Sequence, residues 1–373
     1  LTYRSGCRES GAFHIYAVLT PDHQFSLVAF LFFCSGERVK QFAIFLFGIF
    51  LSAISYADTC TQSQIDLGNG DCIDTKFSLT TSATDSFQFG LSAAGTFYVD
   101  CGNGGSLTGT GVSGNNTITR SDTDNAIYTC SYDDNTFSRT IRFAGQATGY
   151  NVGTNYAIGF NVADDTNAKK LTGISGSLGA IFSTVNNPVV GVSQPTFART
   201  FFFCSNLTGN IPENLFTGIH GTPKRFMFYD TFAGCSGLTG SIPEKLFCQN
   251  PNNPNATNCI YGAPKEYIFG GTFNSCYGLT GSIPENLFVG IFGAPAQYMF
   301  SGTFTGCHGL TGSIPENLFS GISGTPAENM FANTFRSTNL SGYIPPSAFA
   351  GLVANGSPYT TGMWSNTFTG TKL

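Results

Sequence analysis

The chain has 373 residues, of which 10% are charged and 14% are aromatic. Its formal net charge of −5 is thinly spread and argues against nucleic acid as a partner, because nucleic-acid binding requires a concentrated basic surface. The aromatic content is sufficient to build a core, so wholesale disorder is not expected.

The N-terminal part has the pattern of an export signal. Val39-Lys40 precedes the apolar run FAIFLFGIFLSAI at 42–54, and the small residues Ser55 and Ala57 suit cleavage after Ala57. The run is shorter than the ~20 residues that a membrane-spanning helix needs. We therefore expect a signal peptide at 39–57 and an untranslated or non-native leader at 1–38. An alternative treats FSLVAFLFF at 25–33 as an arm of a membrane hairpin, although it is too short to span.

Short segments of alternating polar and apolar residues follow. Between turn-forming residues, five segments rich in β-formers predict strands: KFSLTT, SFQFGLS, GTFYVDC, AIYTCSY and FSRTIRF. Several short strands at this spacing predict a β-sandwich over residues 58–165.

Two parts of this region resemble the PKD-like domain of bacterial surface proteins. They are GTFYVDCGNGG at 95–105 and YTCSYDDNTFSRTIRFAG at 128–145, where the family has a strand ending in D-W-G-D-G and then a strand pair. Cys101 replaces the family's Trp and Asn103 its second Asp, which favours a structural turn over a calcium site. Cys130 lies near the family's His position, so the resemblance implies a Cys101–Cys130 disulfide.

A long internal repeat begins at Leu171. Its leucine marker recurs at spacings of 36, 31, 41, 31, 30 and 33 residues, at Leu207, Leu238, Leu279, Leu310, Leu340 and Leu373. Such periods indicate a repeat array in which neighbouring copies bury one another. We expect about six copies over 166–373, cut short at the C-terminus. The longest interval contains the insertion CQNPNNPNATNC, where we expect a Cys248–Cys259 disulfide. Before the repeats, Cys60–Cys72 is a third expected disulfide.

Each copy is predicted to form a strand and a short helix. LTGSIP predicts a strand with Leu and Ile inward. In GTPAENMFANTF at 324–335, Thr325, Pro326 and Glu328 suit the N-cap, N1 and N3 positions of a helix. Phe331 and Phe335 then lie at i and i+4 on one helical face.

The repeat motif resembles a known family. TF-x-G-C-x-G-L-T-G-S-I-P is similar to the F-x-x-C-x-x-L-T-x-I-x-I-P pattern of BspA-like leucine-rich repeats of bacterial surfaces, over about 200 residues. LTGSIPENL also resembles the core of plant-type repeats. The implied fold class is a β-sandwich (PKD/Ig-like) followed by an α/β leucine-rich-repeat solenoid.

Two positions of the repeat carry residue types that can bind metal ions. The first is a cysteine three residues after each TF pair, which Thr338 and Thr371 replace in the last copies, as a packing position permits and a metal ligand does not. We expect these cysteines to stay reduced in the core: Cys204, Cys235, Cys276 and Cys307. The second is a glutamate after each Pro, expected to form a solvated acidic stripe, with a weak cation site as the alternative: Glu213, Glu244, Glu285 and Glu316.

The expected function is binding. The sequence has no H-E-x-x-H, G-x-S-x-G or phosphate-binding motif, so we expect no enzyme, cofactor or metal. The resemblance and the export signal predict a secreted or bacterial cell-surface protein, such as an adhesin, that contacts a protein or glycan ligand on another cell or matrix. No nucleic acid and no membrane span in the mature chain are expected. The alternatives are a self-associating surface or stalk protein and a secreted enzyme whose catalytic domain follows Leu373.

The binding residues are predicted from positions that vary among the copies. The position after the cysteine varies and should face solvent, so that successive copies align it into a strip: Ser205, Ser236, Tyr277, His308 and Asn339. Three nearby variable residues would widen the strip: Tyr229, Asn274 and Arg336. Tyr, His and Arg supply contact area and directional hydrogen bonds at binding surfaces. The alternative is that these positions vary because nothing selects them.

Overall fold

A computed structural model describes most of the chain after residue 59. The described residues are 15–19, 25–29, 60–68, 70–114, 116–134, 136, 138–153, 156–162, 164–352 and 362–373. The chain divides into two compact units, Leu1–Ala57 and Asp58–Leu373. In the first, β1 (Ile15–Leu19) pairs antiparallel with β2 (Phe25–Ala29). The predicted signal peptide at 39–57 lies outside the described residues.

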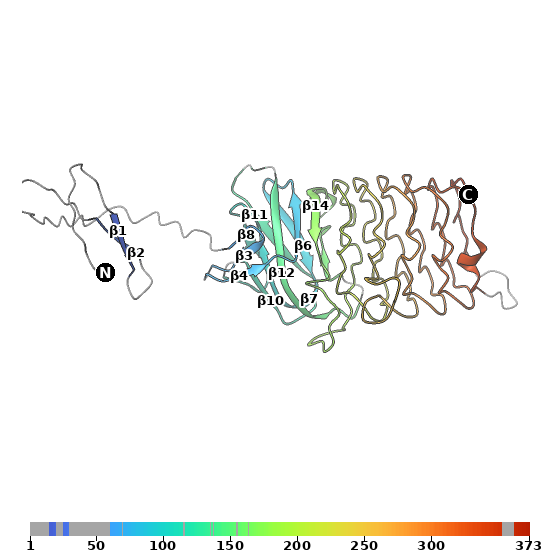
Figure 1. The fold of residues 1–373 in the computed structure, drawn as a ribbon, viewed down its shortest axis with the longest axis horizontal. Coiled ribbons are helices and arrows are strands. Elements are labelled where there is room, and N and C mark those ends of the chain that lie inside the picture. Colours follow the sequence, from blue (N-terminus) through green and yellow to red (C-terminus); the bar gives the residue numbers. More distant parts are fainter. Residues whose placement is uncertain are drawn as a thin grey trace, which may run out of the picture. The chain divides into compact units, whose positions relative to one another are not determined.

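The second unit begins with antiparallel sheets, which Figure 1 shows in cyan and green. One sheet has the order β14-β5-β12-β7-β10-β9, another β13-β6-β11-β8, and β3 pairs with β4. The bounds are β3 (Gln64–Asp66), β4 (Cys72–Asp74), β5 (Phe77–Thr81), β6 (Ser86–Leu91), β7 (Ala93–Asp100), β8 (Ser106–Thr108), β9 (Val112–Ser113), β10 (Thr117–Arg120), β11 (Ala126–Ser131), β12 (Arg139–Tyr150), β13 (Ile158–Gly159) and β14 (Leu171–Gly176). The short helix α1 (Asp165–Lys169) begins at the N-cap Asp164.

The five strands predicted from alternation are confirmed as β5, β6, β7, β11 and β12. In β5 every second residue is buried, which is the pattern of a strand with one face on the core. The two larger sheets share that core, because the ring of Phe89 on β6 lies 5.2 Å from that of Phe143 on β12.

The three expected cysteine pairs are disulfides: Cys60–Cys72, Cys101–Cys130 and Cys248–Cys259. The turn after β7 is held by Asp100, which accepts a hydrogen bond from the Gly102 N–H at 2.8 Å and one from Arg142 at 2.8 Å. Both carboxylate oxygens of Asp100 are therefore used within the protein.

After β14 the chain forms a stack of turns, seen in Figure 1 as adjacent loops of backbone. Every second N–H from Phe226 to Gly234 bonds a carbonyl of the next repeat, as in Phe228 to Ile268 at 2.8 Å. The intervening N–H groups bond three residues back, as in Tyr229 to Phe226 at 3.2 Å. Each repeat thus alternates a tight turn with a contact to its neighbour, which satisfies the backbone without a helix or a continuous strand.

This backbone has a period of four residues. In the second repeat Phe226, Asp230 and Gly234 have positive φ (59°, 51° and 80°), and Tyr267, Gly271 and Ser275 repeat the pattern. Side chains between successive left-handed residues point inward. Phe228, between residues 226 and 230, and Phe232, between residues 230 and 234, are both fully buried. The spacing i, i+4 therefore arises from consecutive turns and not from a helical face.

Columns of stacked rings fill the interior. Phe228, Phe269, Phe300 and Phe331 follow one another with centroids 5.7 to 5.8 Å apart and nearly parallel planes. A second column runs through Phe201, Phe232, Phe273, Phe304 and Phe335. Phe160 stacks on Phe201 at 5.4 Å and on Phe77 of β5 at 6.1 Å, so the core of the repeats continues that of the sheets.

The predicted fold class is wrong. From Ser177 to Leu373 the described residues contain no α-helix, and their helical structure is one 3-10 turn, η1 (Pro346–Phe349). The predicted helix start at Thr325, Pro326 and Glu328 leads into turns. Among the described residues, β-type pairing between neighbouring repeats takes the form of isolated parallel bridges such as Gly281 to Leu310. The described chain combines antiparallel sheets with stacked turns, and an α/β leucine-rich-repeat solenoid is not shown.

Candidate functional site: an arginine and tyrosine pocket

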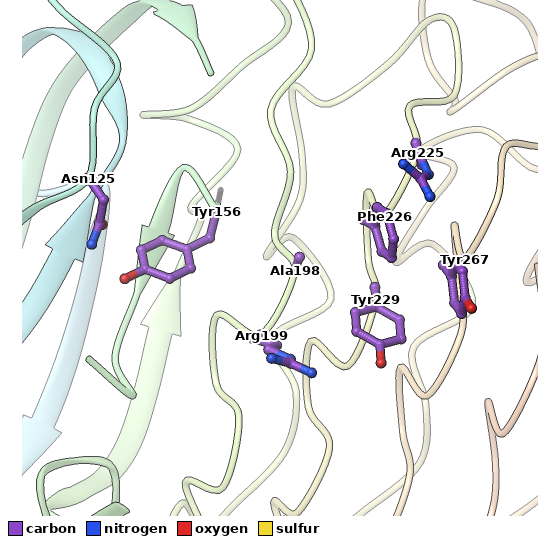
Figure 2. A pocket seen from close by; sticks show the side chains of 8 residues that line it. All are labelled: Asn125, Tyr156, Ala198, Arg199, Arg225, Phe226, Tyr229 and Tyr267. Carbon is purple, nitrogen blue, oxygen red and sulfur yellow. The ribbon is translucent and has the colours of Figure 1, made fainter. Parts of the chain in front are cut away.

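An open pocket of about 590 Å³ lies where the sheets meet the first repeats. Figure 2 shows two side chains from the sheet region on one side and six from the repeats on the other. The lining residues are Asn125, Tyr156, Ala198, Arg199, Arg225, Phe226, Tyr229 and Tyr267. Among the predicted binding residues, Tyr229 lines this pocket.

The turn backbone projects the pocket's side chains outward. Arg199, Phe226 and Tyr267 occupy left-handed positions, with φ of 58°, 59° and 55°. A bulky residue in this region of backbone space is uncommon and strained, because its Cβ crowds the following carbonyl. In the last copy the position of Phe226 and Tyr267 is occupied by Gly362, which has φ of 74°. The ring is therefore not required by the turn itself.

Aromatic rings form one wall of the pocket. Phe226 and Tyr267 stack at 4.9 Å with an interplanar angle of 8°, and Tyr267 stacks on Tyr298 at 4.6 Å. Tyr229 lies edge-on to both Phe226 and Tyr267, with centroids 5.4 Å away. The rings pack against one another, which restricts the orientations open to each of them.

Two arginines supply positive charge. The Arg199 Nε lies 3.4 Å from the Asp230 Oδ2, and the Arg225 Nε lies 2.7 Å from the Glu266 Oε2. The Arg199 guanidinium also lies over the rings of Phe202 (5.0 Å) and Tyr229 (5.4 Å), and that of Arg225 over Phe226 (4.6 Å). Each arginine is thus positioned by an ion pair at its Nε and by an aromatic ring beneath its guanidinium.

The charges around Arg199 shift the neighbouring pKa values. Burial raises the pKa of Asp230, and the Arg199 charge opposes this shift. Burial and the nearby Asp230 carboxylate raise the pKa of Tyr229. Asp230 has a side-chain exposure of 13% against 54% for Arg199, so the cation faces the solvent and its carboxylate lies behind it.

The sheet side of the pocket adds polar groups. The Asn125 Oδ1 accepts a hydrogen bond from Ser92 at 3.1 Å, which fixes the orientation of the amide. Burial raises the pKa of Tyr156, so its phenol is neutral at ordinary pH and can donate a hydrogen bond. Nearby, the Lys224 Nζ donates to the Asn151 carbonyl at 2.6 Å, and burial lowers the pKa of Lys224 to about 8.

In the predicted strip that follows the cysteines, residues of successive copies contact one another. Ser236 Oγ donates to the Ser205 carbonyl at 3.5 Å, Tyr277 and His308 stack at 5.4 Å, and Asn339 Nδ2 donates to the His308 carbonyl. Tyr277, His308 and Asn339 are exposed, while the two serines are half-buried.

The three residues expected to widen this strip have different surroundings. Tyr229 lies in the pocket, and Arg336 is exposed beside the turn of the preceding copy, where its carbonyl accepts from the Gly306 N–H at 2.8 Å. Asn274 is half-buried and its Oδ1 accepts from Ser275 at 2.9 Å.

Sequence reasoning missed most of the pocket. Asn125, Tyr156, Arg199, Arg225, Phe226 and Tyr267 were not among the expected binding residues. A signal was available in RFMF, EYIF, QYMF and ENMF, which start at 225, 266, 297 and 328 and keep the last Phe while the second residue changes. Assigning these segments to a helix hid the outward column to which Phe226 and Tyr267 belong.

The repeated cysteines are buried, unpaired thiols, as expected. Cys235, Cys276 and Cys307 each donate to a carbonyl of the preceding repeat at 3.0 to 3.1 Å. A hydroxyl can make the same kind of bond, and Thr338 and Thr371, which replace the cysteine, donate to carbonyls three residues back. This explains why Thr is tolerated in the slot.

The repeated glutamates pair with the next copy. Glu244 accepts from Asn286 at 3.1 Å, Glu285 from Asn317 at 2.6 Å, and Glu316 from Tyr343 at 2.6 Å. Lys245 lies 3.7 Å from Glu213. Within the described residues, no three His, Cys, Asp or Glu side chains are grouped so as to hold a metal ion.

Comparison with protein-family models, curated proteins and solved structures finds no match for this chain. The resemblance to BspA-like repeats and to PKD-like domains therefore remains a prediction. The described residues contain no helix long and apolar enough to cross a membrane, and their three disulfides are compatible with an extracellular protein.

Proposed function

We propose that the protein is secreted or displayed on a cell surface and binds a protein or glycan ligand of another cell or of a matrix. The observation that supports this proposal is the convergence of two arginines and four aromatic side chains on one open pocket. Arginine and aromatic residues are the types that carry most binding energy at recognition surfaces. Ring contacts and ion pairs restrain these side chains, which reduces the ordering needed on binding.

This proposal keeps the binding role predicted from the sequence but moves the main binding site from the strip to the pocket. The pocket is the primary contact, and the strip containing Tyr277 and His308 is a secondary one. The strip offers a single stacked pair of exposed rings, whereas the pocket collects side chains from the sheets and from successive repeats. A catalytic role is not proposed.

Binding of the labelled protein to host-type cells and to extracellular matrix tests this proposal. We expect saturable binding by a monomer, because the pocket belongs to a single chain. Tyr267→Gly, which removes one ring of the pocket wall, should weaken binding about 10-fold, in the range found for interface aromatics. The double variant Tyr277→Ala and His308→Ala should weaken it less.

Two outcomes would contradict the proposal. Absence of saturable binding, together with assembly that grows with protein concentration, would support a self-associating structural protein instead. Loss of binding only in the Tyr277 and His308 variant would assign the contact to the strip. Both variants change side chains outside the core, so circular dichroism should show an unchanged fold.

A further inference from the structure

The charge of the pocket lining is opposite to that of the whole chain. The protein carries a formal net charge of −5, yet the lining includes Arg199 and Arg225 and no carboxylate. Asp230 and Glu266 pair with the arginines but do not line the pocket. A ligand in the pocket therefore meets cationic groups first, which favours an anionic group over a neutral or cationic one.

The two arginines are prepared for an oxyanion. In each, the Nε is engaged by a carboxylate and the guanidinium lies on an aromatic ring, so the side chain loses little freedom when a ligand arrives. The terminal NH2 groups are the donors that form paired bonds with planar carboxylates. A planar carboxylate therefore matches the geometry of these donors.

The remaining lining suits a ligand that is polyhydroxylated as well as acidic. Tyr156, Tyr229 and Tyr267 combine an apolar ring with a hydroxyl, and Asn125 adds an oriented amide. Sugar rings present C–H faces that pack on aromatic rings and hydroxyls that hydrogen-bond to polar side chains, whereas an acidic peptide would use mainly the arginines. The pocket's volume of about 590 Å³ lies within the 300–1,000 Å³ usual for small-ligand sites.

The repeat backbone determines where three of the lining side chains project. Arg199, Phe226 and Tyr267 all stand at left-handed positions, where glycine is the least strained residue. Left-handed positions recur every four residues in the repeats, so this backbone directs the three side chains outward toward the pocket. The turn at Gly362 shows that this backbone forms without a side chain.

We propose that this pocket binds an acidic saccharide, with Arg199 and Arg225 holding its carboxylate and the tyrosines contacting its sugar rings. This inference rests on the proposed binding function and specifies the ligand's chemistry. It does not depend on whether the saccharide belongs to a cell surface, a matrix or a free polymer, because the recognised groups are the same.

Calorimetric titration of the whole protein with trigalacturonate, and with its methyl ester as the uncharged control, tests the inference. We expect the acid to bind about 10-fold to 100-fold more tightly than the ester, as the loss of charge-assisted hydrogen bonds implies. Sialyllactose and lactose form a second matched pair with a differently placed carboxylate. Failure of both acidic sugars to bind at millimolar concentration would overturn the proposal, as would equal affinity for acid and ester.

Variants locate the contact. Arg199→Gln and Arg225→Gln should each weaken binding of the acid about 10-fold and leave binding of the ester unchanged. Lys245→Gln, which removes an exposed charge from another repeat, should alter neither. An equal loss in the Lys245 variant would show that net charge, and not the pocket, governs binding.

The same variants separate this inference from the proposed function. Binding of trigalacturonate that survives both arginine substitutions, in a protein that still binds cells or matrix, would overturn the acidic-saccharide proposal and leave the binding function standing. Loss of cell binding together with loss of trigalacturonate binding would support both. If the unaltered protein binds neither acidic sugars nor cells, both proposals are wrong.

Discussion

The sheets and the repeats satisfy the same backbone groups in different ways. In the sheets, strands far apart in sequence pair: β14 lies beside β5, so that Ser175 faces Ser78. In the repeats, the N–H groups of runs such as 226–234 alternate between a bond three residues back and a bond to the next copy. The sheets must close long loops before they gain stability, whereas each repeat depends only on its neighbours.

The two regions also differ in what their buried polar groups do. In the sheets, the fully buried Arg139 donates to the Ala83 carbonyl at 3.1 Å and lies 3.8 Å above the ring of Tyr132. In the repeats, many buried polar groups are hydroxyls and thiols that bond the preceding copy, as Thr303 bonds the Phe269 carbonyl at 2.9 Å. The buried polar groups of the sheet region make contacts that occur once, whereas those of the repeat region make the same hydrogen bond in successive copies.

The largest expected effect comes from Phe304→Ala. Phe304 is fully buried between Phe273 and Phe335, each 5.8 Å away, so its loss should leave a cavity and lower the free energy of unfolding by about 3–5 kcal/mol. Denaturant unfolding can be followed by the fluorescence of Trp364, the only tryptophan, and by circular dichroism. Tyr277→Ala, at a side chain with 50% exposure, is the control.

This experiment also tests whether the regions are one cooperative unit. The ring contact between Phe160 and Phe201 joins their cores, so fluorescence and circular dichroism should shift together. A shift confined to Trp364 would show that the repeats unfold separately from the sheets. An unchanged midpoint would contradict the assignment of Phe304 to the core.

Disulfide removal should have the next largest effect and should be greater in the sheets. Cys101–Cys130 closes 29 residues and Cys248–Cys259 closes 11. Loop-closure entropy predicts losses of about 3–4 and about 3 kcal/mol for the corresponding Cys→Ala pairs. Unfolding free energies of the two variants under non-reducing conditions check the order. A larger loss for the 248–259 pair would mean that the insertion stabilises the stack by more than closing a loop.

Removing a single buried hydroxyl should cost less. Thr303→Val removes a buried hydroxyl that bonds the Phe269 carbonyl at 2.9 Å and the Phe300 carbonyl at 2.8 Å, and the unfolding free energy should fall by about 1–3 kcal/mol. Thr80→Val in β5 removes a half-buried bond to Thr172, and its cost should be under about 1 kcal/mol, because water can replace the partner. Similar losses in the two variants would remove the distinction drawn between the regions.

The smallest effect concerns pH and Lys224. Burial lowers the pKa of Lys224 from 10.5 to about 8, so the folded state favours the neutral amine. The unfolded chain then binds more protons between these values, and folding stability should rise with pH from about 8 to 10.5 and lose this contribution below 8. Lys224→Met should remove that part of the rise. Melting temperatures across this range check it, and parallel curves for the two proteins would contradict it.

The sequence predicted the sheets well because their signal is local. Alternation in FSLTT of β5 and AIYTCS of β11 reflects one buried face, and strands obey that rule wherever they pair. The disulfide partners also agree with the structure. The order of strands could not be read, because pairing such as β14 with β5 depends on contacts across the whole region.

The repeats show why a correct period can give a wrong element. Phe331 and Phe335 do face the same interior, but left-handed residues at Asn329 and Asn333 turn the chain every four residues. A helix and this run of turns produce nearly the same spacing of buried side chains. Glycine and asparagine recur at those positions and tolerate positive φ, so the sequence already indicated turns there.

The insertion at 248–259 makes the protein suited to display. Its ends meet at a neck, with the two cysteine Cα atoms 4.0 Å apart and the Gln249 N–H bonded to the Asn258 carbonyl at 2.8 Å. The rings on either side keep their spacing, because Phe247 lies 6.2 Å from both Phe216 and Phe288. The loop also contacts the preceding copy, where the Gln249 Oε1 accepts from Thr217 at 2.9 Å and the Ala256 carbonyl lies 3.2 Å from the His220 Nδ1. A foreign epitope grafted into this loop for vaccine or affinity-reagent design should therefore preserve the register of the stack if it keeps these two contacts.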